Sequence, residues 1–418
     1  MDLISYCDKL AHRSHSASRD LARASTAQKN RWLLAAGDGL VHRAKDILAA
    51  NAKDVALAEA THLPAAQLDR LRLDESRVIG IAKGLLEIAS LSDPVGRVLD
   101  ERTRPNGLKI QKVAVPLGVI LFIYESRPNV TVDAAGLCVK SGNAVILRGG
   151  KESLHTNQAL YAVLRDSLEG VQLPPDAVQL VTTPDHAAVG HLLTLDRWID
   201  LVIPRGGESL IRRVAGEARM PVLKHYQGNC HVYVDRAADI DMALAILLNA
   251  KCQRPGVCNA AESLLVHADV AAAFLPRAGS ALRERGVEIR GCPETCRLIP
   301  EAKPATDADH AAEFLDLILS VKVVDSLEAA VDHIARFGSQ HTEAIITNDP
   351  RAAERFTAAV DSAAVMVNAS TRFNDGYEFG LGAEVGISTD KFHARGPCGL
   401  QELCSYKYIV HGAGQVRE

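Results

Sequence analysis

Cys258 is the residue whose neighbourhood in the sequence most favours chemistry. It follows a Pro-Gly turn and lies between a helix-like stretch, residues 240–250, and an apolar, strand-like run, residues 263–267. A thiol on a turn between two rigid elements can face a cleft, and nearby cations such as Lys251 and Arg254 lower the pKa of a thiol toward that of a reactive thiolate. The alternative is a small, buried apolar residue, as most free cysteines are. Cys258 taken alone favours this alternative, so the choice depends on the rest of the chain.

Two glycine turns have the character of phosphate-binding turns. Arg148-Gly-Gly-Lys151 follows the apolar run 144–147, and Pro204-Arg-Gly-Gly-Glu208 follows the run 200–203. Glycine lets the backbone approach a ligand, and the N–H groups at the start of a following helix favour anions. Neither turn has the GxGxxG fingerprint, and strand-to-helix turns often contain glycine for backbone reasons alone. Lys151 stands where an acidic residue would select a ribose hydroxyl, so it favours a 2′-phosphate and NADP over NAD.

The elements that must position these residues follow from hydrophobic patterning. A first set of short apolar runs lies at 119–123, 144–147, 178–181 and 200–203. Helical patterns, such as residues 156–168, lie between these runs. A second set at 263–266, 321–324, 344–347 and 363–367 is spaced by helical patterns at 326–337 and 350–360. Continuous apolar strands separated by helices are typical of parallel sheets covered on both faces. The predicted fold class is therefore α/β, with two such domains in tandem.

The remaining segments have patterns of their own. Residues 18–90 are rich in Ala and Leu and predict helices, 376–399 is rich in Gly and predicts a loop, and 403–410 predicts an edge strand. The dipeptide Asn106-Gly107 favours a hairpin turn within residues 98–115. A two-stranded ribbon is marginal alone in water, so we expect it to join a sheet, either a partner's or one of its own chain.

Composition excludes several classes of protein. The chain has 418 residues, enough for two or three domains, and its net charge of -4 offers no basic field for nucleic acid. Its nine cysteines contain no CxxC pair, which favours a reducing compartment over a disulfide framework. Neither a signal region nor a membrane-spanning run is present; the nearest candidate, residues 113–123, is interrupted by Pro116. These features predict a cytoplasmic protein that binds neither membrane nor nucleic acid.

Zinc signatures are also absent from the sequence. There is no HExxH, and Cys292 and Cys296 lack a second pair at structural-zinc spacing. We therefore expect no metal cofactor.

Eight sequence segments, taken in their order along the chain, resemble the aldehyde dehydrogenase superfamily and, more closely, its gamma-glutamyl phosphate reductases. They span nearly the whole chain at residues 115–120, 123–135, 140–151, 203–207, 225–235, 253–260 (Gln-Arg-Pro-Gly-Val-Cys-Asn-Ala), 313–324 and 396–400 (Gly-Pro-Cys-Gly-Leu). The resemblance implies reduction of L-glutamyl 5-phosphate with NADPH to L-glutamate 5-semialdehyde and phosphate, through a cysteine thioester. This is the second step of proline biosynthesis from glutamate, and the resemblance also implies functional coupling to glutamate 5-kinase.

The resemblance also assigns roles to single residues. It makes Cys258 the nucleophile, and it matches Gly206 and Gly207 to the turn beside the cofactor pyrophosphate. Arg148 and Lys151 match positions next to the adenosine ribose, and Glu313 matches the carboxylate that holds the nicotinamide ribose. Loop residues after the strand at 365–368 are our candidates for binding the amino-acid head of the substrate: Ser370, Thr371 and Arg372. An ordinary polar loop is the alternative there.

The resemblance further implies a division into domains and an assembly. Residues 1–97 and 116–228 would form the NADP-binding domain, and 229–397 the catalytic domain. Residues 98–115 and 398–418 would form an oligomerisation extension of a dimer or tetramer.

The departures from the superfamily pattern favour a reductase. Acid-forming aldehyde dehydrogenases have a glutamate base in a Glu-Leu-Gly-Gly motif, whereas this chain has His225-Tyr-Gln-Gly228. A site without that carboxylate should hydrolyse its thioester slowly. The donor of the oxyanion hole stays open between Asn129 and Arg127, and Arg127 suits the leaving phosphate equally well.

Two rival interpretations follow. The first is an NADP-dependent semialdehyde dehydrogenase that makes a free acid, which the missing glutamate opposes. The second is a catalytically silent binding or scaffold protein, since a fold alone never implies activity. The presence of Cys258, Glu313 and both glycine turns opposes the second.

Overall fold

The computed structural model describes residues 2–125 and 127–417 and divides into two compact units. Unit 1 comprises Met1–Lys224, Gly380–Gly386 and Cys398–Glu418, and unit 2 comprises His225–Phe379 and Ile387–Pro397. Each unit is described by itself. None of the helices in the described ranges has the length and hydropathy needed to cross a membrane.

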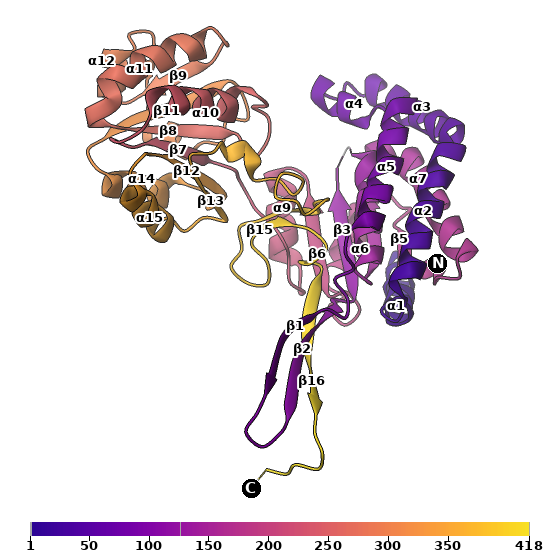
Figure 1. Ribbon diagram of the computed structural model, residues 1–418. Coiled ribbons are helices and arrows are strands. Elements are labelled where there is room, and N and C mark those ends of the chain that lie inside the picture. The colour runs from indigo at the N-terminus through magenta and orange to yellow at the C-terminus, as the bar shows by residue number, and fades with distance from the viewer. Residues whose placement is uncertain (1, 126, 418) are drawn as a thin grey trace. The chain divides into compact units, whose positions relative to one another are not determined.

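In the described part of unit 1, the core is a parallel sheet with strand order β5-β4-β3-β6 (Figure 1). Its strands are β3 (Val119–Tyr124), β4 (Ala144–Gly149), β5 (Val178–Leu180) and β6 (Leu201–Arg205). Successive side chains of a strand point to opposite faces. Residues 119, 121 and 123 therefore pack with helices α1 and α8, while residues 120 and 122 are buried on the face of α6 and α7. The first predicted set of strands is confirmed.

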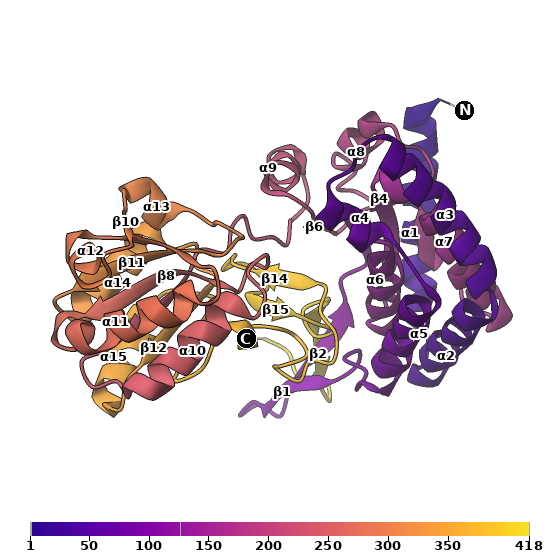
Figure 2. The same ribbon diagram turned by 90° about the horizontal axis from the view of Figure 1, so that it is seen from above.

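The helices of unit 1 surround this sheet and extend beyond it (Figure 2). They are α1 (Leu3–Leu21), α2 (Thr26–His42), α3 (Ala44–Ala60), α4 (Ala65–Leu71), α5 (Glu75–Ser90), α6 (Pro128–Lys140), α7 (Leu154–Gly170), α8 (His186–Leu192) and α9 (Glu208–Glu217). Short 3₁₀ turns lie at Lys151–Ser153 and Pro175–Ala177. Helix α1 begins well before residue 18, where helices were first expected. Its buried face includes Ser14 and Ser18, so its apolar stripe is weak in the sequence.

Unit 2 is built on a second parallel sheet, with strand order β10-β9-β11-β8-β7-β12-β13. Its strands are β7 (Cys230–Val234), β8 (Ala261–His267), β9 (Glu288–Gly291), β10 (Lys303–Pro304), β11 (Ile318–Val324), β12 (Thr342–Ile346) and β13 (Ala364–Val367). Its helices are α10 (Ile240–Cys252), α11 (Ala268–Arg283), α12 (Pro293–Leu298), α13 (Asp307–Ala311), α14 (Leu327–Phe337) and α15 (Pro350–Ala359), with a 3₁₀ turn at Thr371–Phe373.

Helices cover both faces of the unit 2 sheet. Figure 1 shows α10 and α11 on one face and α14 and α15 on the other. Val232 and Leu264 pack with α10 and α11, whereas their neighbours Tyr233 and Leu265 pack with α14 and α15. The predicted α/β class and its second set of strands are confirmed. The segment 376–399, expected to be a loop, also contains the short paired strands β14 (Gly386–Ser388) and β15 (Gly396–Cys398).

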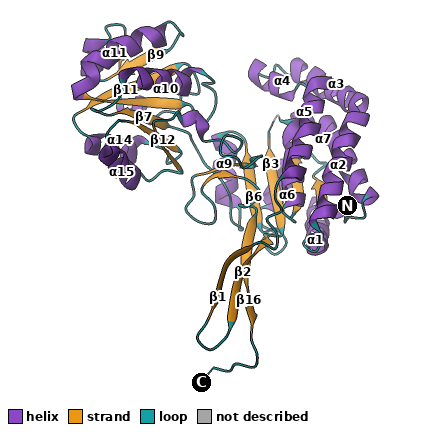
Figure 3. Ribbon diagram, viewed as in Figure 1, coloured by secondary structure: helices purple, strands orange, loops and turns teal. Residues whose placement is uncertain are grey.

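The predicted hairpin and C-terminal strand form one antiparallel ribbon within unit 1 (Figure 3). Strand β1 (Val98–Thr103) pairs with β2 (Lys109–Pro116), and the turn places Gly107 at a φ of 87°. Strand β16 (Cys404–His411) pairs with the other edge of β2 along its whole length. Every residue of β1 is exposed, so the ribbon has little core of its own.

Candidate functional site

Cys258 lies in unit 2, on the loop between α10 and β8, where the sequence placed it. The residue is half-buried, and its carbonyl oxygen accepts a hydrogen bond from the Cys230 thiol, with 3.1 Å between Sγ and O. Cys230 begins β7, an interior strand that lies between β8 and β12. The backbone of the predicted nucleophile is therefore tied to the sheet.

Gly228 allows a second segment to run against this loop. A Cβ at Gly228 would overlap the carbonyl group of Cys258, so a larger residue does not fit there. The Gly228 N–H donates to Glu313 Oε1 at 2.9 Å. One glycine thus brings the His225–Gly228 segment, Cys258 and the predicted ribose-binding carboxylate together within unit 2.

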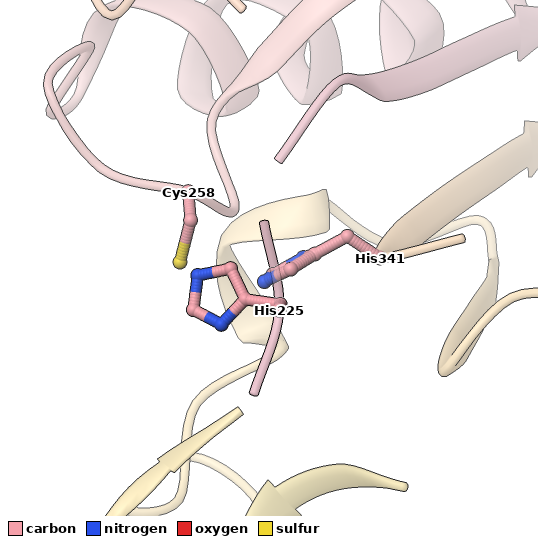
Figure 4. A group of neighbouring side chains, drawn as sticks. All are labelled: His225, Cys258 and His341. Carbon is pink, nitrogen blue, oxygen red and sulfur yellow. The ribbon is translucent and has the colours of Figure 1, made fainter. Parts of the chain in front are cut away.

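Two histidines adjoin the thiol (Figure 4). One ligand atom from each of His225, Cys258 and His341 lies within 4.8 Å of the others, and the two rings meet edge to face with centroids 5.1 Å apart. His225 Nδ1 donates to the carbonyl oxygen of Ile387 at 2.8 Å, since a carbonyl only accepts. In the neutral ring, Nε2 then has the lone pair and is the basic nitrogen.

His341 is fully buried beside this pair. Its Nδ1 lies 2.7 Å from Thr342 Oγ1 and 3.7 Å from Cys230 Sγ. Its Nε2 has no hydrogen-bond partner among the residues that the structure describes. Burial holds the pKa of His341 well below its usual value, and the neighbouring His225 lowers it further. His341 is therefore neutral at physiological pH.

Sequence reasoning missed both histidines as functional residues. His225 was singled out only for lacking a carboxylate, although imidazole is itself a base. No motif in the sequence around His341 indicates a functional role. It immediately precedes β12, and only the folded sheet brings it close to Cys258.

Lys251 is not the activating cation that its position suggested. Its ammonium pairs with Glu262, with 2.6 Å between Nζ and Oε2, and neither side chain is exposed. Burial lowers the pKa of Lys251 and raises that of Glu262 to about 7. The charge of Lys251 is thus compensated by Glu262 rather than directed at Cys258.

Arg372, rather than Lys251, is a cation that contacts the loop holding Cys258. Its Nε donates to Gln253 Oε1 at 2.8 Å, and its Nη1 donates to Asn259 Oδ1. These partners flank Cys258 on the same loop. Burial lowers the pKa of Arg372, whereas the negative charge of a Cys258 thiolate raises it. These hydrogen bonds fix Arg372 against both ends of the loop that holds Cys258.

The other two predicted substrate-binding residues precede Arg372 and are buried. The Ser370 hydroxyl accepts the Arg372 backbone N–H at 3.3 Å and caps the 3₁₀ turn. Thr371 Oγ1 has no hydrogen-bond partner within the described chain. The structure thus gives Ser370 a structural contact, and binding of substrate by this loop stays a prediction.

The oxyanion-hole candidates lie in unit 1, where α6 begins. Arg127 is the N-cap residue of α6, and Asn129 is an exposed residue in the first turn. Asn129 Nδ2 donates to Asp133 Oδ2 at 2.9 Å, and burial raises the pKa of Asp133 to about 6 despite this bond. The choice between the two donors stays open.

The second glycine turn lies at the carboxyl end of β6, where the strand order of unit 1 reverses, the usual ligand-binding place in such sheets. Gly207 is the N-cap residue of α9, and its N–H donates to Glu125 Oε2 at 3.1 Å. A Cβ at Gly206 would collide with the same carboxylate. An anionic group thus already lies at this helix N-terminus.

The first glycine turn follows β4. The Arg148 guanidinium is buried and donates to the carbonyl oxygens of Gly149 at 3.0 Å and Pro184 at 3.2 Å, so it ties the end of β4 to the loop that precedes α8. Burial lowers its pKa. Lys151, in contrast, is exposed at the start of the 3₁₀ turn.

Comparison with known proteins identifies the family. The family model described as "Aldehyde dehydrogenase family" matches residues 7–291. The gamma-glutamyl phosphate reductase of Rhodopirellula baltica is 60% identical over 416 residues, which is 100% of this chain and 96% of that protein. The corresponding protein of Moorella thermoacetica is 55% identical over 97% of both chains.

Solved structures agree with this result. The crystal structure of gamma-glutamyl phosphate reductase from Thermotoga maritima matches with a TM-score of 0.97 and 44% identity, covering 99% of this chain and 100% of that one. An acetylating aldehyde dehydrogenase from Geobacillus thermoglucosidasius, at 15% identity and a TM-score of 0.69, shares the fold over 100% of this chain and 98% of that one. The chain belongs to the aldehyde dehydrogenase family, within its group of gamma-glutamyl phosphate reductases.

Proposed function

We propose that the chain reduces L-glutamyl 5-phosphate to L-glutamate 5-semialdehyde with NADPH and releases phosphate. It would act in proline biosynthesis, in the cytoplasm, on the product of glutamate 5-kinase. Relatives with the name of this activity match at 53–60% identity over 97–100% of the chain. The observation that supports the chemistry most directly is the thiol of Cys258 beside a histidine, His225, rather than a carboxylate.

The proposed reaction begins when Cys258 Sγ attacks the acyl carbon. The thiol proton passes to His225 Nε2, because Nδ1 is held by the Ile387 carbonyl. The C–O bond to phosphate breaks, phosphate leaves, and a thioester remains on Cys258. When bound, NADPH supplies the hydride that converts this thioester to the aldehyde level. The C–S bond then breaks, and the semialdehyde leaves.

The proton on His225 explains why the thioester survives. An imidazolium has no lone pair with which to activate water, whereas a carboxylate in the same place would remain a base. His225 can instead return its proton when the thiolate leaves. This assignment favours the reductase over an acid-forming dehydrogenase.

The two glycine turns of unit 1, at residues 148–151 and 204–208, have features that suit the binding of a phosphorylated dinucleotide. The Gly207 N–H at the N-terminus of α9 donates to the Glu125 carboxylate, and backbone N–H groups at a helix N-terminus favour anions, which supports this proposal. Space around Gly207 is open: a Cβ there would meet nothing within 4 Å. We assign Gly206 and Gly207 to the pyrophosphate, Glu313 to the nicotinamide ribose, and Lys151 with Arg148 to the 2′-phosphate end.

The test runs the reaction backwards. Glutamate semialdehyde, NADP and inorganic phosphate should produce NADPH at a rate that depends on phosphate. Formation of NADPH without phosphate would instead identify the acid-forming dehydrogenase. No turnover in either direction would favour the scaffold interpretation.

We also propose that the chain forms a dimer or tetramer through its ribbon. Tyr406, Tyr408 and Val410 alternate along β16 and are each about half exposed. The Tyr406 and Tyr408 rings contact each other edge to face at 5.8 Å, and Lys112 Nζ lies 3.7 Å from the Tyr406 ring centroid. An apolar face on a ribbon without a core is typical of a surface that packs against another chain.

A further inference from the structure

Cys258 and the two histidines next to it offer the ligand atoms of a zinc site. One atom each from His225, Cys258 and His341 lies within 4.8 Å of the others (Figure 4). Imidazole nitrogen and thiolate sulfur are preferred zinc ligands, and in a tetrahedral site such donors lie about 3.3 to 3.6 Å apart. Small side-chain rotations would therefore suffice. Sequence spacing did not predict this cluster because its members come from three separate segments of unit 2.

Each ring already has a hydrogen-bond partner at Nδ1. A metal-ligating histidine usually donates its other ring N–H to a fixed acceptor. His225 Nδ1 has the Ile387 carbonyl oxygen at 2.8 Å, and His341 Nδ1 has Thr342 Oγ1 at 2.7 Å. In this arrangement the two Nε2 atoms are the ones that can bind an ion.

A second observation points independently to a ligand. His341 is fully buried, and its Nε2 has no hydrogen-bond partner in the described ranges. An unsatisfied buried polar atom is costly, so such an atom calls for a bound water, an ion or a functional role. A cation bound to this nitrogen would satisfy it.

We propose that His225, Cys258 and His341 bind Zn²⁺ through three protein ligands, with a fourth position open to water, and that this ion reversibly inhibits the enzyme. The zinc–sulfur bond forms as the Cys258 thiol releases its proton to solvent, and no electrons are transferred. The ion is an inhibitor rather than a cofactor. Its inhibitory effect rests on the proposed role of Cys258 as nucleophile, whereas its binding does not.

Cobalt is the probe that separates binding from catalysis. Protein stripped with chelator, in buffer free of phosphate, should bind one Co²⁺ and show a thiolate-to-cobalt charge-transfer band with tetrahedral ligand-field bands. Zn²⁺ should displace the cobalt and abolish both. Cys258→Ser should remove the charge-transfer band, although this variant has no activity to lose.

Matched variants locate the histidine ligand. His341→Asn should weaken Co²⁺ and Zn²⁺ binding at least about tenfold. Thr342→Val should weaken it as well, because it removes the nearer of the two partners of Nδ1, at 2.7 Å, and leaves Cys230 Sγ at 3.7 Å. His333→Asn is the control, because His333 is another buried histidine of unit 2, packed against His310 and Phe337 instead. Its metal affinity should equal that of the parent.

The outcomes are distinct. An unchanged cobalt spectrum in Cys258→Ser, or equal losses of affinity in His341→Asn and His333→Asn, would overturn the site. Zinc inhibition that chelator reverses, weakened in Thr342→Val, would support it fully. Cobalt binding with the expected spectrum but without inhibition of the parent would support the site, and it would overturn both the inhibitory role and the proposed nucleophile.

Discussion

Lys251 and Glu262 form an ion pair, 2.6 Å from Nζ to Oε2, in which neither side chain is exposed. Lys251 belongs to α10 and Glu262 to β8, so the pair closes the base of the loop that holds Cys258. Glu262 Oε1 also accepts the Leu315 N–H at 3.1 Å. The same pair therefore fixes the segment that contains Glu313.

Replacing Lys251 with Met should destabilise the protein strongly. The change leaves the Glu262 carboxyl buried without its cation, and breaking a buried pair from one side costs about 3–5 kcal/mol. Urea unfolding of unit 2 should show this loss. The double variant Lys251→Met, Glu262→Leu should recover most of it, since apolar residues replace both charges. A single variant as stable as the parent would mean that the pair contributes nothing.

Cys258→Ala should abolish reduction and leave NADPH binding nearly intact. The two covalent steps have no route without the thiol, and loss of a nucleophile typically lowers kcat by at least about 10³-fold. Turnover and fluorescence titration with NADPH measure the two effects separately. Cys292→Ala, at another half-buried thiol of unit 2, is the control and should retain activity. Substantial turnover of the Cys258 variant would refute the covalent mechanism.

Lys151→Met should weaken NADPH binding far more than NADH binding. Only NADPH has the 2′-phosphate, and a hydrogen bond to a charged group contributes about 1.5–3 kcal/mol, or roughly ten- to a hundredfold in affinity. Dissociation constants for both cofactors provide the measurement, and NADH is the internal control. Equal losses would place Lys151 away from the phosphate.

The contribution of His333 to stability should fall as the pH drops below about 6.5, the ordinary pKa of histidine. Burial, chiefly, and then the positive charges of His231, His310, Lys322 and Arg336 lower the pKa of His333 to about 2. Between these two values the unfolded chain binds a proton that the folded chain does not, which costs up to about 1.4 kcal/mol per pH unit.

His333→Phe tests this assignment. The aromatic ring can keep its contact with Phe337, whose centroid lies 4.7 Å from that of His333, but it does not titrate. The slope of unfolding free energy against pH, between pH 5 and 6.5, should decrease in the variant relative to the parent. The same slope in both proteins would assign the titration to other groups.

Long apolar runs predicted the buried strands β3, β4, β8 and β12 because a strand covered on both faces needs no alternation. Strand β7, which lies beside β8, was not predicted, since His231 interrupts its short apolar run. Strand β9 was missed because it has charged residues, Glu288 and Arg290, at alternate positions. Cys258 was predictable from its loop and motif. The residues that contact this loop could not be predicted from the sequence. Contacts such as Lys251–Glu262 and Arg372–Asn259 join side chains whose burial is determined only by the fold.

Removing residues 403–418 should lower the mass per particle and the activity together. The deletion removes β16, with the exposed Tyr406 and Tyr408, and it uncovers the edge of β2. Sedimentation equilibrium measures the mass. Truncation after His411 is the matched control: it leaves β16 complete and should behave as the full chain. Tyr406→Ser with Tyr408→Ser separates the two effects, because it disrupts the apolar face while every backbone pair between β16 and β2 remains. If the protein that lacks β16 keeps the mass per particle of the full chain, the ribbon is not the subunit interface.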